Sequence, residues 1–205
     1  VFAEFKDWVK ETSIPISNQE LDEDDPAVVA TYLKRRLREI PSGRDAATTY
    51  HRMSVGILEL LFYPDAISPQ VEREIHEGRK RIDITFDNAA PSGFFELLHS
   101  VHQLPSQYIF VECKNYSRDV ENPEIDQLSG RFDINTGKFG LLLCRHVDDM
   151  ALLIRRCADT YHSGRGMMIP VVDEDLLDML DRVIAGDTRP YEQLLASRFR
   201  DIALR

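Results

Sequence analysis

The sequence lacks the features that define membrane, secreted and metal-finger proteins. Its best apolar run, Ile57–Tyr63, is interrupted by Glu59 and is much shorter than the roughly 18–20 residues of a membrane helix. Residues 1–10 carry four charges, unlike a secretion signal. Its three cysteines form no CxxC pair and no zinc spacing. We therefore expect a cytoplasmic protein without a membrane partner. The missing initiator methionine is expected of a processed chain or a piece of a larger protein or complex.

Signatures of other enzyme classes are also missing. There is no glycine-rich phosphate loop, no nucleophilic-serine elbow and no zinc motif. His99 and His102 are spaced i, i+3 but have no third ligand near them in the sequence, so we expect no metal role for them. The 205 residues are 43% hydrophobic and 29% charged, a globular composition that excludes a disordered chain or a disulfide scaffold.

The net charge of −10 at first disfavours a nucleic-acid partner, but the acidic residues are unevenly distributed. Residues 1–25 carry a net charge of −6 and residues 171–187 a net charge of −5, so the rest of the chain is close to neutral. Lys34–Arg38 holds four basic side chains on an expected helix. This basic face is either simply solvated or in contact with phosphates, and both interpretations stay open.

Hydrophobic periodicity divides the chain into alternating helices and strands. Pro26 begins a helix that ends near Ile40, and a longer helix follows over about Asp45–Phe62. The segments Gln70–His76 and Arg81–Phe86 predict a β-hairpin. The later elements are a helix at 94–104, a strand at 108–114, a helix from 122, a strand at 139–144, a helix from 149, a strand at 167–172, a helix at 174–184 and a C-terminal helix.

This order of elements predicts one α/β domain. We expect three layers, with a mixed central sheet of about five strands flanked by helices. The domain is expected at residues 26–185, residues 1–25 forming an N-terminal extension or linker and residues 186–205 a C-terminal helix.

Two of the expected strands bring acidic and basic side chains to one face of the sheet. Because successive strand residues point to opposite faces, Asp83, Glu112 and Lys114 all lie on the side away from the apolar face. If the two strands are neighbours, two carboxylates and one ammonium group converge. Carboxylates hold Mg²⁺, which lowers the pKa of a bound water, and a lysine can orient or deprotonate that water. The grouping therefore suits phosphodiester hydrolysis, whereas the alternative is a surface salt bridge of little energetic value.

At these residues the sequence resembles the PD-(D/E)xK nuclease superfamily. Asp83 is followed 29 residues later by Glu112-Cys113-Lys114. Gln127, on the next expected helix, is similar to the glutamine found there in the type IV restriction-enzyme and resolvase-like branches. The resemblance covers roughly residues 48–180. It departs from the family's pattern at Ile82, where a proline is usual, and in the inserted helix at 94–104.

The resemblance implies a restriction endonuclease-like fold and a metal-dependent endonuclease acting on DNA in restriction, antiviral defence or repair. It implies Mg²⁺ as the cofactor, with Mn²⁺ as a substitute. Because family members often pair to cut both strands, it leaves a homodimer open. The implied catalytic residues are Asp83, Glu112, Lys114 and Gln127. The implied metal ligands are Asp83, Glu112, Cys113 and Glu59, and the implied phosphate contacts are Arg79, Lys80, Arg118 and Arg131.

Two other functions stay open from the sequence. One is a catalytically degraded module that keeps the nuclease fold and binds nucleic acid or a protein partner without cleaving. The presence of Asp83, Glu112 and Lys114 together favours the enzyme over this alternative. The other is a mainly protein-binding module, for which the acidic ends of the chain speak. Glu59 flanks the apolar stripe of its helix, so a solvated glutamate is its alternative interpretation.

Overall fold

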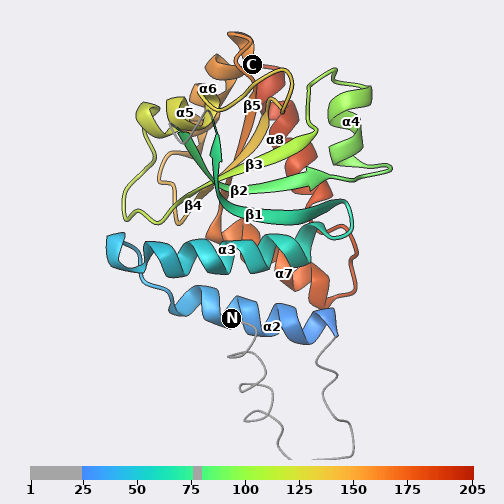
Figure 1. Ribbon diagram of the computed structural model, residues 1–205. Coiled ribbons are helices and arrows are strands. Elements are labelled where there is room, and N and C mark those ends of the chain that lie inside the picture. Colours follow the sequence, from blue (N-terminus) through green and yellow to red (C-terminus); the bar gives the residue numbers. More distant parts are fainter. Residues whose placement is uncertain (1–24, 76–79) are drawn as a thin grey trace, which may run out of the picture.

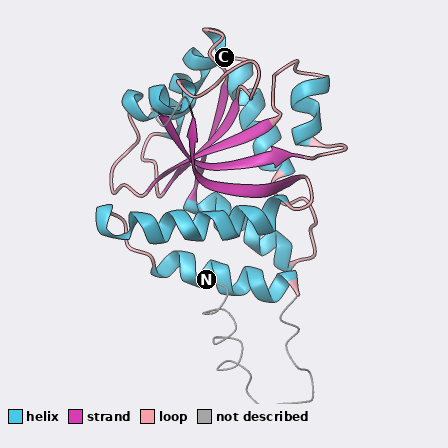
Figure 2. Cartoon of the chain, viewed as in Figure 1, coloured by secondary structure: helices cyan, strands magenta, loops and turns pink. Residues whose placement is uncertain are grey.

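The computed structural model describes residues 25–75 and 80–205, which form three layers (Figure 1). The central sheet has five strands in the order β1-β2-β3-β4-β5. The first three strands pair in antiparallel fashion, and β4 and β5 continue the sheet in parallel. Helices α2, α3 and α7 lie on one side of the sheet, and α4, α5, α6 and α8 on the other (Figure 2). The expected three-layer α/β architecture with a mixed five-stranded sheet is confirmed.

The elements follow the hydrophobic pattern closely. Asp25 caps α2, because its carboxylate accepts a 2.8 Å hydrogen bond from the main-chain N–H of Ala27, and Pro26 follows at the first helical position. The helices are α2 (Pro26–Glu39), α3 (Ala47–Phe62), α4 (Phe94–Ser100), α5 (Asn122–Ser129), α6 (Met150–His162), α7 (Asp173–Ile184) and α8 (Glu192–Ala203), with a short 3₁₀ turn at Arg44–Ala46. The strands are β1 (Ala66–Ile75), β2 (Lys80–Asn88), β3 (Tyr108–Lys114), β4 (Phe139–Cys144) and β5 (Met167–Val172).

Two boundaries differ by four residues from the expected ones, and backbone irregularities explain both. β1 begins at Ala66 rather than at Gln70, because the register shifts between Ile67 and Gln70 and Ser68 has a φ of 54°. A bulge of this kind breaks the alternation from which a strand is recognised. α4 ends at Ser100 instead of 104, and Gln103 has a φ of 52°, a left-handed conformation that a helix cannot contain.

The parallel strands β4 and β5 are buried on both faces, as parallel pairing requires. Every residue of β4 is buried, which places this strand at the centre of the core. α8 packs against α6 and β5, and Tyr191 at its start donates a hydrogen bond to the buried carboxylate of Asp65. Among residues 25–75 and 80–205, no helix is both long and apolar enough to cross a lipid bilayer.

Candidate active site

The end of β3 carries the two charged residues on which the site depends. Glu112 and Lys114 are two positions apart, share one face of the sheet, and are both buried. The ammonium of Lys114 donates a 2.8 Å hydrogen bond to Oε1 of Glu112 and a 3.0 Å hydrogen bond to Oε1 of Gln127. The last bond reaches from the sheet to α5, so the lysine is held from two elements.

Asp83 joins this end of the sheet from β2. The backbone ladder between β2 and β3 stops at the pair of Ile84 and Val111. Beyond it, Oδ2 of Asp83 accepts a 2.9 Å hydrogen bond from the main-chain N–H of Cys113. The carboxylate of Asp83 therefore binds the main-chain N–H of Cys113, which a further backbone hydrogen bond of the ladder would otherwise have used. The predicted neighbourhood of Asp83, Glu112 and Lys114 is thus present in the fold, although its catalytic role stays a prediction.

The local sequence of α5 explains why Gln127 reaches the lysine. Glu121 and Glu124 form a capping box, in which Glu124 accepts a 3.1 Å hydrogen bond from the main-chain N–H of Glu121. Ile125 and Leu128 are buried, which fixes the rotation of the helix about its axis. Gln127 is then placed at the edge of the buried face, close enough to bind the ammonium of Lys114.

Arg131 lies elsewhere than the sequence predicts, and it has another partner. Gln127 and Arg131 are spaced i, i+4, which predicts that they project together from one helix. In the structure α5 ends at Ser129 and Arg131 follows the helix. Its Nη1 donates a hydrogen bond to Oε2 of Glu112, and its side chain is only 6% exposed. In this structure Arg131 pairs with Glu112, so both oxygens of that carboxylate have a cationic partner. We call Asp83, Glu112, Lys114, Gln127 and Arg131 the charged cluster.

Cys113 can offer a metal only its main-chain carbonyl oxygen. The thiol points to the other face of the sheet, on the side of α3, where Ser54 bonds to it. Burial raises the pKa of the Cys113 thiol well above its ordinary value, and the charge of Asp83 adds to this shift. The thiol therefore stays protonated at neutral pH and is a poor ligand.

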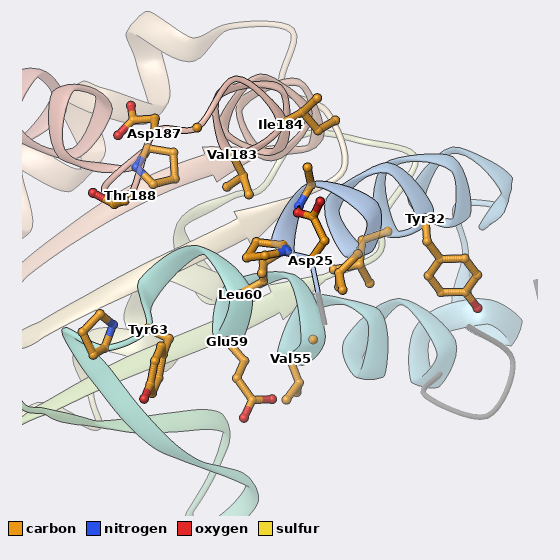
Figure 3. Close-up of a pocket in the computed structure, with 18 of the residues that line it drawn as sticks. Asp25, Tyr32, Val55, Glu59, Leu60, Tyr63, Val183, Ile184, Asp187 and Thr188 are labelled. Carbon is orange, nitrogen blue, oxygen red and sulfur yellow. The ribbon is translucent and has the colours of Figure 1, made fainter. Parts of the chain in front are cut away.

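Glu59 does not join the charged cluster, which corrects the expectation that it is a metal ligand. The site-facing end of α3 is marked by His51, whose Nε2 donates a 2.9 Å hydrogen bond to the main-chain carbonyl of Asp83. Glu59 is eight residues further along, about 12 Å by helical rise. It is exposed and lines an apolar groove instead (Figure 3).

This apolar groove lies between α2, α3 and the segment 183–190, and it has a volume of about 960 Å³. Figure 3 shows Val55, Glu59 and Leu60 along its α3 side, with Val183 and Ile184 of α7 across from them. Its lining contains none of the five residues of the charged cluster. Its apolar walls are formed mainly by Ala27, Val29, Leu33, Val55, Leu60 and Val183.

The predicted phosphate contacts are placed only in part. Arg118 follows β3, lies over the ring of Tyr116 with its guanidinium carbon 5.0 Å from the ring centre, and is more than half exposed. It also contacts Glu121 at 3.6 Å and Glu124 at 3.4 Å. Arg79 and the side chain of Lys80 lie outside the described residues, so their predicted roles stay predictions.

Sequence reasoning missed the residues that support the site. The side-chain amide of Asn115 donates hydrogen bonds to the main-chain oxygens of Pro41 and Gly43, at 3.2 and 2.7 Å. The main-chain carbonyl of Asn115 accepts a 2.8 Å hydrogen bond from the N–H of Gly43. These bonds tie the connection between α2 and α3 to the end of β3. The adjacency of Asn115 to Lys114 was the one signal in the sequence, whereas nothing marked His51.

The donor atoms suit Mg²⁺ in type, but their charge is already balanced. Two carboxylates and the Cys113 carbonyl are oxygen ligands of the kind that Mg²⁺ prefers. Within the residues that the structure describes, no three His, Cys, Asp or Glu side chains are grouped to hold a metal. Lys114 and Arg131 together neutralise Asp83 and Glu112. In the structure as it stands, the ion pairs of Glu112 with Lys114 and Arg131 leave no uncompensated negative charge in the cluster.

Comparisons with known proteins supply no relative for this site. No family model matches the chain, and no match was found among the curated proteins or among the solved structures.

Proposed function

We propose that this domain is a metal-dependent nuclease that hydrolyses phosphodiester bonds of DNA. The observation that carries the proposal is the fixed position of Lys114, held by Glu112 and Gln127 at the end of β3, with Asp83 beside it on β2. An ammonium group fixed beside two carboxylates matches the chemical needs of an attack by water on a phosphodiester.

Each side chain has a distinct task in this proposal. Asp83, Glu112 and the main-chain carbonyl of Cys113 hold Mg²⁺, which supplies Lewis-acid polarisation of the phosphoryl oxygen when it is bound. The ammonium of Lys114 has three donors, of which Glu112 and Gln127 accept two. Its third donor orients the attacking water or contacts the phosphoryl oxygen on which charge accumulates. Gln127 is a positioning residue, because it acts through Lys114.

The site's own charge balance favours a second candidate function. The buried pair of Arg131 and Glu112 neutralises a carboxylate that a metal would otherwise use. A module that keeps the fold and binds DNA without cleaving it would have this closed arrangement permanently. The two functions make opposite predictions about divalent metal ions.

A plasmid-nicking assay with the purified chain separates them. The nuclease should convert supercoiled to open-circle DNA with Mg²⁺ or Mn²⁺ and should stop with EDTA. Lys114→Ala and Asp83→Asn should each lower the rate at least about a hundredfold. Asp83→Asn keeps an amide oxygen that can accept the bond from Cys113, so a loss of folding cannot explain its effect. Lys138→Ala, which removes a surface lysine bonded to the carbonyl of Gly164, is the control and should nick normally.

Two outcomes would contradict the nuclease. The first is nicking by Lys114→Ala at the rate of the unchanged protein. The second is DNA binding without any metal-dependent nicking, which would establish the non-cleaving module.

We also propose that the domain works in the reducing cytoplasm. Its three cysteines are unpaired. Burial raises the pKa of Cys144 and of Cys157 to about 12, so both remain thiols at neutral pH.

A further inference from the structure

The ion pair between Arg131 and Glu112 is the one contact of the charged cluster that the proposed chemistry does not use. Glu112 is 1% exposed, so its carboxylate depends on protein partners in place of water. Lys114 occupies Oε1, and Arg131 occupies Oε2.

A divalent ion and Arg131 compete for the same carboxylate. Binding of the ion would place two further positive charges beside a guanidinium that already neutralises Glu112. Releasing Arg131 into a buried site without a new partner is strongly unfavourable, because a desolvated charge would remain unpaired. Metal binding to the protein alone should therefore be weak.

A DNA phosphate removes this obstacle. The planar guanidinium of arginine binds a phosphate through two parallel hydrogen bonds, a geometry that matches its fork of donors. Arg131 follows the end of α5 and stands on the same side of the sheet as Lys114, where the scissile phosphate would bind. An incoming phosphate gives Arg131 a new partner and leaves Oε2 of Glu112 to the metal.

We propose that Arg131 is an exchangeable partner of Glu112 that makes metal binding and DNA binding depend on each other. In the protein alone it pairs with Glu112 and weakens metal binding; with DNA it transfers to a backbone phosphate and metal binding tightens. This inference rests on the proposed nuclease function, and it assigns Arg131 as a positioning residue for Glu112. Because coupling between two ligands is reciprocal, the metal must tighten DNA binding by the same factor.

Calorimetric titration of Ca²⁺, which takes the same oxygen ligands, tests the exchange. The titration is run on the protein alone and on the protein saturated with a short DNA duplex, whose length is checked on a gel afterwards. In the unchanged protein, the duplex should lower the Kd for Ca²⁺ at least about tenfold, within the usual range of such couplings. Arg131→Gln alone should bind Ca²⁺ at least about tenfold more tightly than the unchanged protein, and the duplex should add less than about threefold.

Arg165→Gln is the matched control. Arg165 pairs with Asp126 of α5 at 2.7 Å, but this pair is exposed and lies outside the charged cluster. Its removal should leave both Ca²⁺ affinities unchanged. If Arg131→Gln does not fold, Arg131→Lys, which keeps the positive charge but lacks the fork of donors, is titrated in its place and should show a smaller effect of the duplex.

The possible failures are distinguishable. If Ca²⁺ binds but the duplex does not change its Kd, or if Arg131→Gln binds it no better than the unchanged protein, the exchange is wrong and the metal site stands. If neither Ca²⁺ nor Mn²⁺ binds at millimolar concentration to any form, with or without DNA, the proposed nuclease fails and the exchange fails with it.

Discussion

The apolar groove and the charged cluster are opposite kinds of site within one domain. The groove is large, about 960 Å³, and is walled mainly by apolar side chains of α2, α3 and α7. In the cluster, Glu112, Lys114 and Arg131 are nearly excluded from solvent. A cleft of about 520 Å³ lies beyond the carboxyl ends of β3 and β4, where Tyr116 and Arg118 line it.

This difference shows that the volume of a hollow and its chemistry are separate properties. A large apolar pocket is often the first candidate for a binding site, provided that polar groups converge in it. In the groove the charged side chains of Arg52 and Glu59 are exposed. In the cluster, charged groups lie close together but are already paired with one another. Substitutions in the two regions can test whether water is excluded from the cluster and whether the groove is unoccupied.

Removing Glu112 should have the largest effect on stability. Glu112→Ala leaves the ammonium of Lys114 and the guanidinium of Arg131 buried without their shared partner. Loss of one partner of a buried ion pair costs about 3–5 kcal/mol of unfolding free energy. Glu59→Ala in the groove removes an exposed carboxylate and should change it by less than about 0.5 kcal/mol. Urea denaturation measures both. A loss below about 1 kcal/mol for Glu112→Ala would mean that water reaches the cluster.

A second group of buried, mutually paired side chains lies on the α3 side of the sheet, and we expect it to make the stability of the protein depend on pH. Asp173 at the start of α7 contacts Arg145 at 2.9 Å and accepts a 3.0 Å hydrogen bond from Tyr50. Burial raises the pKa of Asp173 to about 6, although Arg145 and Tyr50 both lower it. The folded protein therefore keeps a proton that the unfolded chain releases above about pH 4. This contribution to stability is complete below pH 4 and is lost as the pH rises through 6.

The full size of this contribution is about 3 kcal/mol, because one pKa unit corresponds to about 1.4 kcal/mol. The difference in unfolding free energy between the unchanged protein and Asp173→Asn should therefore fall between pH 4 and pH 7. Asp187→Asn, at the rim of the groove, is the comparison. The main-chain N–H of Arg189 and the side chain of Arg182 lower the pKa of Asp187, so its contribution is lost as the pH falls. The Asp187 effect should be smaller, because solvent screens this carboxylate. A flat difference for Asp173→Asn would contradict the raised pKa.

The parts of the fold and site that depend on local periodicity were predictable from the sequence. The period of two along a strand put Glu112 and Lys114 on one face, and the pattern of apolar residues placed Gln127 on the following helix. The same reasoning missed the start of β1, because the hydrophobic pattern does not indicate the left-handed conformation of Ser68.

The partners of long charged side chains were not predictable, because they depend on contacts far apart in the chain. Arg131 could equally face solvent or Glu112 until the end of α5 is known. Glu59 was ambiguous for a related reason. α3 packs against the sheet on one side and against α2 on another, so a residue flanking its apolar stripe can belong to either side. The structure places Glu59 at the groove and His51 at the site.

The smallest predicted effect tests the groove directly, at Gly56 in the middle of α3. A glycine within a helix is less favourable than alanine by about 0.5–1 kcal/mol. A methyl group at Gly56 would meet only Cδ2 of Leu33, at an ordinary contact distance of 3.9 Å. Gly56→Ala should therefore stabilise the protein by about 0.5–1 kcal/mol and leave nicking activity unchanged. Thermal and urea denaturation measure the gain.

Gly140→Ala in β4 is the control for a glycine that has no room. A Cβ atom there would lie 3.0 Å from the carbonyl oxygen of Phe110 and 3.1 Å from the ring of Phe132, so this substitution should destabilise the fold. If Gly56→Ala were also destabilising, something would already occupy the floor of the groove. A truncation that removes residues 1–24 tests whether that part of the chain is the cause: only then would the gain at Gly56 return, whereas an open groove predicts the same gain in both forms.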